Sequence, residues 1–194
     1  MRKLLTAIAT AAALVTPLAH AQANNFEGFS VGLGVTSADT TSEVVTGTST
    51  NASNTDNNAV LQLQYNMAVN NTFVVGFGGT ANLGDLKAGT FGANQKKLKD
   101  GYSLYVAPGY VFTKGWMGYA KLAYLNASLQ NSTGSSLSFD NGWGYGLGVQ
   151  ALFGKNWFGQ AEYMVDQYND RSSMPGQTDK LKSSVFALTA GYKF

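Results

Sequence analysis

Apolar and polar side chains alternate with a period of two along most of the chain, and the alternation continues to its last residue. On one parity of the final stretch the side chains are apolar and mostly large: Phe186, Leu188, Ala190, Tyr192 and Phe194. Successive side chains of a β-strand point to opposite faces, so this pattern predicts a strand. An edge strand of a soluble β-sandwich is the alternative, but an exposed aromatic edge invites pairing with other chains. The pattern favours the closing strand of a membrane barrel, in which lipid covers the aromatic face and closure removes the edge.

Seven further runs show the same alternation, which brings the number of predicted strands to eight. The runs cover residues 29–36, 59–67, 72–80, 102–112, 116–124, 142–153 and 157–166, followed by 181–194. Each run has about ten residues, enough for a tilted strand to cross an apolar band near 25 Å. Pro108 lies inside the fourth run, and because proline disrupts a central strand we expect a bulge there, near the periplasmic rim.

The connections between the runs are alternately short and long. The short ones are Asn70–Asn71, Thr113–Gly115 and Gly154–Asn156. The long ones are Ser37–Asn58, Gly84–Lys99, Ser128–Asp140 and Asn169–Lys180. Short periplasmic turns and long extracellular loops are typical of transmembrane barrels. The predicted fold is all-β, an eight-stranded antiparallel up-and-down transmembrane β-barrel with both termini in the periplasm. We expect the polar segment Ser37–Asn58 to be a mobile loop above the rim.

The first 23 residues have the pattern of a secretory signal peptide. A basic start at Arg2 and Lys3 precedes a short apolar region and two overlapping small-x-small sites, which end at Ala21 and Ala23. We favour cleavage after Ala23, with Ala21 as the alternative, leaving residues 24–194 as the barrel domain. The whole chain has 13 basic and 11 acidic residues, so removing Arg2 and Lys3 leaves the two signs balanced. This balance gives no reason to expect nucleic-acid binding.

The placement of aromatic residues indicates which face of the barrel meets lipid. Seven of them lie at the ends of runs beside the short turns, as an interfacial girdle requires. They are Tyr110, Phe112, Trp116, Phe153 and Trp157, with Tyr192 and Phe194 at the end of the chain. The opposite parity is rich in Gly, Ser, Thr and Gln, which cannot fill a dry soluble core to native density. The apolar face is therefore predicted to point outward.

Charged and amide side chains in the middle of the runs fall on the inward parity. A lysine facing lipid at mid-membrane costs about 2–4 kcal/mol, and eight strands leave an interior only wide enough for side chains. We therefore expect a luminal polar network made of Gln62, Gln64, Lys121, Gln150, Gln160, Glu162 and Asp166. Its functional interpretation is a gate or an ion path. We favour the structural interpretation, in which buried charges satisfy one another.

The chain lacks most of the side chains on which catalysis and metal binding depend. The only histidine, His20, lies in the signal peptide, and there is no cysteine. Ser-His triads, Cys-His dyads and His-based metal sites are therefore excluded from the mature protein. Glu162 and Asp166 share a parity but lie about 13 Å apart along a strand, beyond the roughly 5–9.5 Å of a glycosidase pair. We expect no enzymatic activity, no cofactor and no metal.

The terminal aromatic strand, signal peptide, strand count and loop asymmetry together resemble the small eight-stranded bacterial outer-membrane barrels of the OmpA/OmpX/opacity-like superfamily (outer membrane protein beta-barrel domain). The resemblance implies a place in the Gram-negative outer membrane, among its lipids, as a monomer. It also implies that Tyr192 and Phe194 form the signal recognised by the barrel-assembly machinery, with periplasmic chaperones acting during biogenesis. Of the roles in this superfamily, we favour a structural or surface-interaction (adhesin-like) role in which extracellular loops meet a surface ligand. A narrow porin-like channel for small solutes or ions is the alternative.

Overall fold

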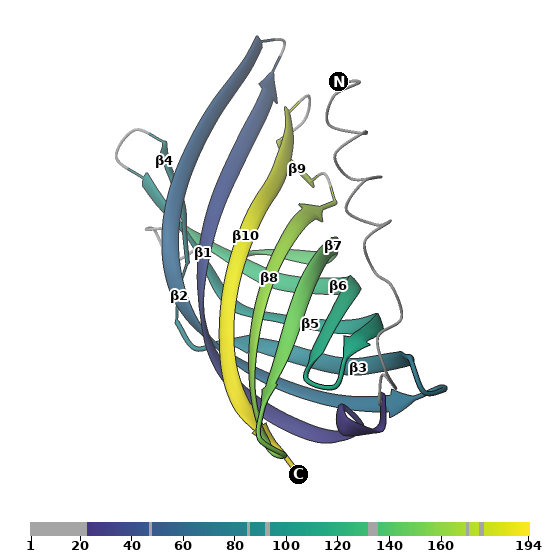
Figure 1. The fold of residues 1–194 in the computed structure, drawn as a ribbon. Coiled ribbons are helices and arrows are strands. Elements are labelled where there is room, and N and C mark those ends of the chain that lie inside the picture. Colours follow the sequence, from purple (N-terminus) through teal and green to yellow (C-terminus); the bar gives the residue numbers. More distant parts are fainter. Residues whose placement is uncertain are drawn as a thin grey trace, which may run out of the picture.

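The computed structural model describes residues 23–46, 48–84, 86–91, 94–131, 136–169, 171–174 and 177–194, and almost all of this chain is β-strand (Figure 1). A short 3-10 turn precedes ten strands. The elements are η1 (Ala23–Asn25), β1 (Gly28–Thr46), β2 (Thr48–Ala68), β3 (Phe73–Asn82), β4 (Leu86–Phe91), β5 (Asn94–Thr113), β6 (Trp116–Asn131), β7 (Ser136–Phe153), β8 (Trp157–Tyr168), β9 (Arg171–Met174) and β10 (Gln177–Lys193). The predicted signal peptide lies outside the described residues, apart from its last residue.

Eight of the strands close into an antiparallel barrel. The sheet order is β1-β2-β3-β5-β6-β7-β8-β10, and β10 pairs back with β1 from Ser30↔Lys193 to Val45↔Thr178. The short strands β4 and β9 lie outside this circuit, β4 on β5 and β9 on β10. The prediction of an eight-stranded up-and-down barrel, closed by the last strand, is confirmed.

The alternation in the sequence becomes an inside and an outside of the barrel. On β8, the side chains of Phe158, Gln160 and Glu162 are buried, whereas Trp157 and Tyr163 are 61% and 52% exposed. The same holds round the barrel, where large apolar side chains such as Leu147, 69% exposed, cover the outer wall. An apolar surface of this extent is stable only where lipid covers it.

The long connections contain much more regular structure than the sequence predicts. Ser37–Asn58, predicted as a mobile loop, is a β-hairpin in which β1 and β2 remain paired as far as Thr46↔Thr48. β10 also follows β1 for most of this length, so β1, β2 and β10 project together above the barrel (Figure 1). The other long connections are likewise mostly hairpin extensions of β5, β6, β7 and β10. The prediction of irregular loops was wrong because a ladder of backbone hydrogen bonds satisfies the chain without apolar side chains to bury.

The bulge predicted at Pro108 is absent. Pro108 pairs with Val75 of β3, and the β5–β6 register is the same before it, at Val106↔Leu122, and after it, at Gly109↔Tyr119. Proline removes one N–H from the ladder, and here the strand continues with Ala107 and Pro108 left out of the β6 pairing. The nearest irregularity in β5 lies between Val111 and Thr113.

Apolar side chains fill the periplasmic half of the lumen. Phe26, Val74, Val111 and Met117 are each at most 2% exposed and belong to one buried cluster. Ala23 joins this cluster, and its N–H donates to the Asn71 carbonyl at 3.0 Å. The segment before β1 therefore packs across the end of the barrel at which the short turns lie.

Candidate functional site

Lys121 and Glu162 form a buried ion pair in the middle of the lumen. Lys121 Nζ lies 2.9 Å from Glu162 Oε1 and 3.0 Å from Oε2, and the two side chains are 3% and 9% exposed. The ammonium lies 3.8 Å from the centre of the Tyr105 ring. Tyr119 OH donates to Glu162 Oε2 at 2.9 Å. These contacts compensate both charges where an unpaired charge would be costly.

Glycines on β7 allow side chains from β6 and β8 to meet across it. Lys121 on β6 is paired with Gly146, and Glu162 on β8 is paired with Gly148. A Cβ at position 148 would overlap the Tyr119 ring, and a Cβ at position 146 would overlap Met164. The alternating glycines of β7 thus provide the space that Tyr119, the phenol partner of the ion pair, and Met164 occupy.

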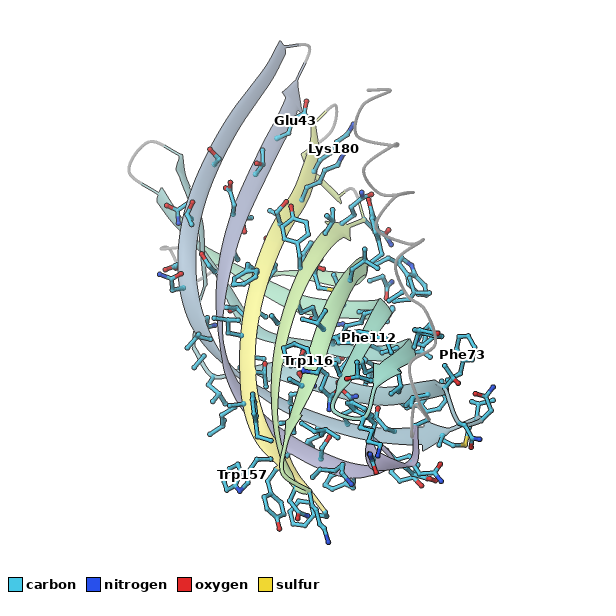
Figure 2. The ribbon with its side chains drawn as sticks, viewed as in Figure 1. Glu43, Phe73, Phe112, Trp116, Trp157 and Lys180 are labelled. Atoms are coloured by element: carbon cyan, nitrogen blue, oxygen red, sulfur yellow. The ribbon has the colours of Figure 1, made fainter. Side chains whose placement is uncertain are left out.

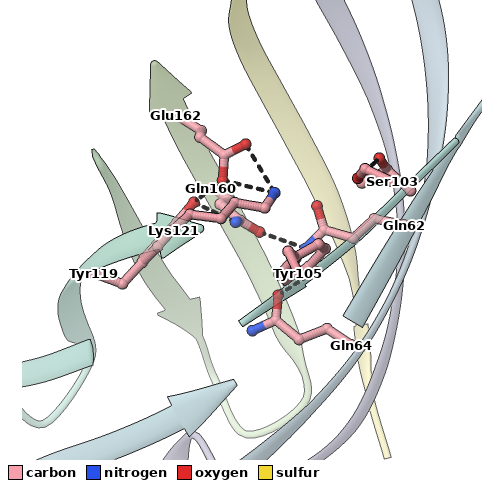
Figure 3. A network of polar contacts seen from close by, with 9 residues as sticks. Gln62, Gln64, Ser103, Tyr105, Tyr119, Lys121, Gln160 and Glu162 are labelled. Atoms are coloured by element: carbon pink, nitrogen blue, oxygen red, sulfur yellow. Dashed lines mark hydrogen bonds and ion pairs between the residues drawn. The ribbon is translucent and has the colours of Figure 1, made fainter. Parts of the chain in front are cut away.

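A chain of amides continues the network from β8 to β2 (Figure 3). Gln62 Nε2 donates to Gln160 Oε1 at 3.0 Å and to Gln64 Oε1 at 2.9 Å. Gln64 Nε2 donates in turn to Asn66 Oδ1 at 2.6 Å, and Tyr105 OH donates to Gln64 Oε1 at 2.9 Å. Gln160 Nε2 also donates to Tyr119 OH, which links the amides to the ion pair. One connected layer of polar side chains therefore crosses the barrel.

The structure joins five of the seven residues predicted for this network and leaves two apart. Lys121, Glu162, Gln160, Gln62 and Gln64 are connected, whereas Gln150 Oε1 and Asp166 Oδ1 are buried without a hydrogen-bond partner in the described chain. Sequence reasoning missed three further members, Asn66, Tyr105 and Tyr119. All three lie at strand positions that face the lumen, and this could have identified them. For the two tyrosines, however, the aromatic ring suggests a residue that faces lipid.

A cavity of about 110 Å³ lies on the extracellular side of the polar layer. Its base is formed by Gln62, Lys121 and Glu162, and it extends toward Asn82 and Asn126 near the ends of β3 and β6 that lie away from the short turns. Five larger aliphatic side chains form much of its wall: Val60, Leu125, Met164, Leu181 and Val185. The lumen is therefore filled toward the periplasm and hollow toward the outside.

The described part of the chain offers no metal centre, since no group of three or more acidic, His or Cys side chains lies close together there. Within the same residues, no helix has the length and apolar character needed to cross a membrane.

The residues predicted for the aromatic girdle lie on the outer wall near the short turns. Tyr110, Phe112, Trp116, Phe153 and Trp157 have exposed fractions between 36% and 62%. Figure 2 shows Trp157 at the end of the barrel opposite the long hairpin that carries Glu43. At the end of the chain, the Tyr192 ring contacts Trp157 and Phe194, with centroid separations of 5.3 and 5.1 Å. Phe194 also donates its N–H to the Phe29 carbonyl at 2.8 Å.

A second set of aromatic side chains, which the sequence reasoning did not single out, lies farther up the outer wall. Trp143 and Tyr145 are 54% and 53% exposed, and Tyr124 packs edge-on against Trp143 at 5.8 Å. On β6, Tyr124 lies eight residues beyond Trp116, about 26 Å along the strand. The outer wall thus has aromatic residues at two levels with an apolar band between them, the arrangement found at the two membrane interfaces of transmembrane barrels.

Comparison with known proteins agrees with this geometry. No curated protein matches the chain significantly. Among solved structures, Neisserial surface protein A (NspA) is similar with a TM-score of 0.55 and 18% identity, covering 87% of this chain and 98% of NspA. Ail, the attachment invasion locus protein of Yersinia pestis, in complex with the heparin analogue sucrose octasulfate, has a TM-score of 0.52 and 20% identity, covering 87% and 99%. The outer membrane protease OmpT from Escherichia coli has a TM-score of 0.50 and 9% identity, covering 93% and 100%.

At these identities, the similarity to solved structures establishes the fold alone. The family described as outer membrane protein beta-barrel domain matches residues 7–194, nearly the whole chain. With the lipid-facing outer wall and the two aromatic levels, this match places the protein in the bacterial outer membrane. The chain belongs to the outer membrane protein beta-barrel domain family.

Proposed function

We propose that this protein acts through its extracellular surface, as a structural or adhesin-like protein that binds a ligand outside the cell, and that it is not an open pore. The observation that carries this proposal is the filled lumen. Gln62, Lys121, Gln150 and Glu162 are 2–8% exposed, and apolar side chains pack beneath them. A solute would have to separate a buried ion pair and its hydrogen-bonded partners to pass.

The long β1–β2 hairpin is the surface that we propose for ligand binding. Pairing of β2 with β3 begins only at Val60, so residues 48–59 extend beyond β3 for about 40 Å along the strand. Because β1 pairs with both β2 and β10 over most of this length, the hairpin is held in a defined orientation. Such a surface loses less conformational entropy on binding than a mobile loop would. Ail, a protein of similar fold, is seen with a sulfated ligand, which supports a role in surface binding for this architecture.

Shortening the hairpin tests the proposal. Thr40 faces Asn54 directly, so residues 41–53 can be replaced by a two-residue Asn-Gly turn without changing the register. We expect the variant to reach the outer membrane and to fold, and cells carrying it to lose binding to host-cell or abiotic surfaces. The matched control shortens the β6–β7 hairpin, where Ser128 faces Ser138, by the same type of turn. Wild-type surface binding by the β1–β2 variant would contradict the proposal.

A narrow channel for small solutes or ions is the second candidate, favoured only by the cavity above the polar layer. In that case, replacing Lys121 or Glu162 with alanine would change the conductance, whereas shortening the hairpin would not. We expect neither luminal substitution to produce a channel, because both residues act as internal supports. We also propose that the protein has no enzymatic activity, because the mature chain has neither imidazole nor thiol.

A further inference from the structure

The cavity above the polar layer contains one acidic side chain that no neighbouring cation pairs with. Several of its polar groups are paired with one another. Thr40 and Ser183 share a hydrogen bond of 3.0 Å, and Thr80 and Ser103 share one of 2.6 Å. Three charged side chains line the cavity: Lys121, Glu162 and Asp166. The first two pair with each other at 2.9 Å, which leaves the carboxyl group of Asp166 as the acidic group of this lining without a paired cation.

The position of Asp166 on β8 directs its side chain into the cavity. It belongs to β8, on the same parity as Glu162 and nearer the extracellular end, and it faces Gly144 of β7. A Cβ at position 144 would overlap Asp166 Oδ1, so the glycine provides the space that the carboxylate occupies. Oδ1 is buried and has no hydrogen-bond partner in the described chain. A buried acceptor without a donor is unusual in a folded protein and requires a reason.

We propose that the cavity is a binding site for a small organic cation, a primary ammonium group carrying a short apolar chain. The ammonium donates to the carboxylate of Asp166, and the chain packs against Leu125, Met164 and Leu181. A charged donor matches this site better than a neutral one, because hydrogen bonds between charged groups are roughly twice as strong as neutral ones. An anion is disfavoured, because it brings no donor to the unsatisfied acceptor Asp166 Oδ1 and would be repelled by the ionised carboxylate.

The size of the cavity limits the length of the ligand. At about 110 Å³ it is somewhat smaller than the engineered cavity of about 150 Å³ that takes up benzene. A ligand with about five non-hydrogen atoms therefore fits, and n-butylammonium is a suitable probe. It enters from the outside, since the polar layer closes the other end. This site goes beyond the proposed surface-binding role and does not depend on it.

Binding of n-butylammonium to the folded barrel in a maltoside detergent tests the proposal. Isothermal titration calorimetry measures the affinity, and the Met164 methyl resonance reports whether the ligand lies in the cavity. n-Butanol and butyrate serve as neutral and anionic probes of similar size. We expect saturable binding of the cation with a shift of the Met164 resonance, and much weaker binding of the other two.

Three variants locate the interaction. Asp166→Asn should weaken cation binding by about tenfold or more, because it removes a charged acceptor. Asp39→Asn, the matched control, removes a carboxylate from the outward face of β1 and should leave affinity within about twofold. Ala123→Leu fills part of the cavity and keeps both carboxylates, so it should also weaken binding. Equal affinity of wild type and Asp166→Asn, absence of binding to wild type, or preference for butyrate would overturn the proposal.

Discussion

Removing the positive charge from the luminal ion pair tests how the barrel interior is stabilised. In Lys121→Met, the Glu162 carboxylate keeps Tyr119 as a donor but loses its two contacts of 2.9 and 3.0 Å with the ammonium. Breaking a buried pair in this way costs about 3–5 kcal/mol, because a buried charge is left uncompensated. The lost contact between the ammonium and the Tyr105 ring is part of that cost, on the order of 0.5–2 kcal/mol.

A double variant distinguishes the energy of the Lys121–Glu162 interaction from the contribution of each residue's other contacts. Lys121→Met combined with Glu162→Gln removes both charges, so its free energy of unfolding should be closer to that of wild type than either single variant is. The interaction free energy from the double-mutant cycle should be about 1–3 kcal/mol. Lys155→Met, in the exposed turn between β7 and β8, is the control and should change stability by less than about 0.5 kcal/mol.

Equilibrium unfolding in urea, with the barrel inserted in lipid vesicles, provides the measurement. The three tryptophans all lie on the lipid-facing wall, so their fluorescence reports the loss of the folded barrel. If Lys121→Met unfolds at the same urea concentration as wild type, or if the two single changes simply add, the ion pair does not stabilise the lumen as described.

Three further predictions concern other parts of the molecule. Phe194→Asp should strongly lower the amount of protein in the outer membrane. It should cost the folded barrel at most about 3 kcal/mol, because this side chain is 69% exposed. Equal membrane levels of variant and wild type would contradict the role of Phe194 in assembly. The sequence pattern favours cleavage after Ala23, but the burial of Ala23 in the periplasmic cluster supports the alternative site after Ala21. Mass spectrometry of the mature chain should therefore show cleavage after Ala21, and a mature chain that begins at residue 24 would refute this. Gly148→Ala should lower stability by about 1–3 kcal/mol, because the added Cβ overlaps the Tyr119 ring in the lumen. Gly118→Ala should be tolerated, because the nearest atom to its added Cβ is 3.7 Å away. Similar urea midpoints for the two variants would exclude the steric explanation.

Most of the barrel could be predicted from the sequence because the period-two pattern carries the required information. Parity alone gives the face on which a side chain lies, and it is sufficient to identify strands, lipid-facing wall and lumen. The long hairpins could not be predicted in the same way. Segments such as Ser37–Asn58 are polar on both faces, and what keeps them extended is backbone pairing with neighbouring strands.

The contacts inside the lumen were less predictable, because parity gives the face of a residue but not its position along the barrel axis relative to residues on neighbouring strands. Lys121 is paired with Gly146, but Glu162 is paired with Gly148, two residues farther along the same strand. The stagger of neighbouring strands therefore decides which inward residues meet, and it is a property of the closed barrel. Asp166 has the parity of Glu162 but lies above the layer, which is why it was predicted in the network and is found apart from it.

The central claim, that side chains close this barrel and that it acts through its outer surface, is tested most directly by single-channel recording. Refolded wild-type protein in a planar lipid bilayer should give no discrete conductance steps. A refolded sample that migrates differently on SDS gels before and after heating serves as the control for a closed barrel. Persistent conductance steps from such a sample, changed by Lys121→Ala or Glu162→Ala, would contradict the claim and identify the polar layer as a gate.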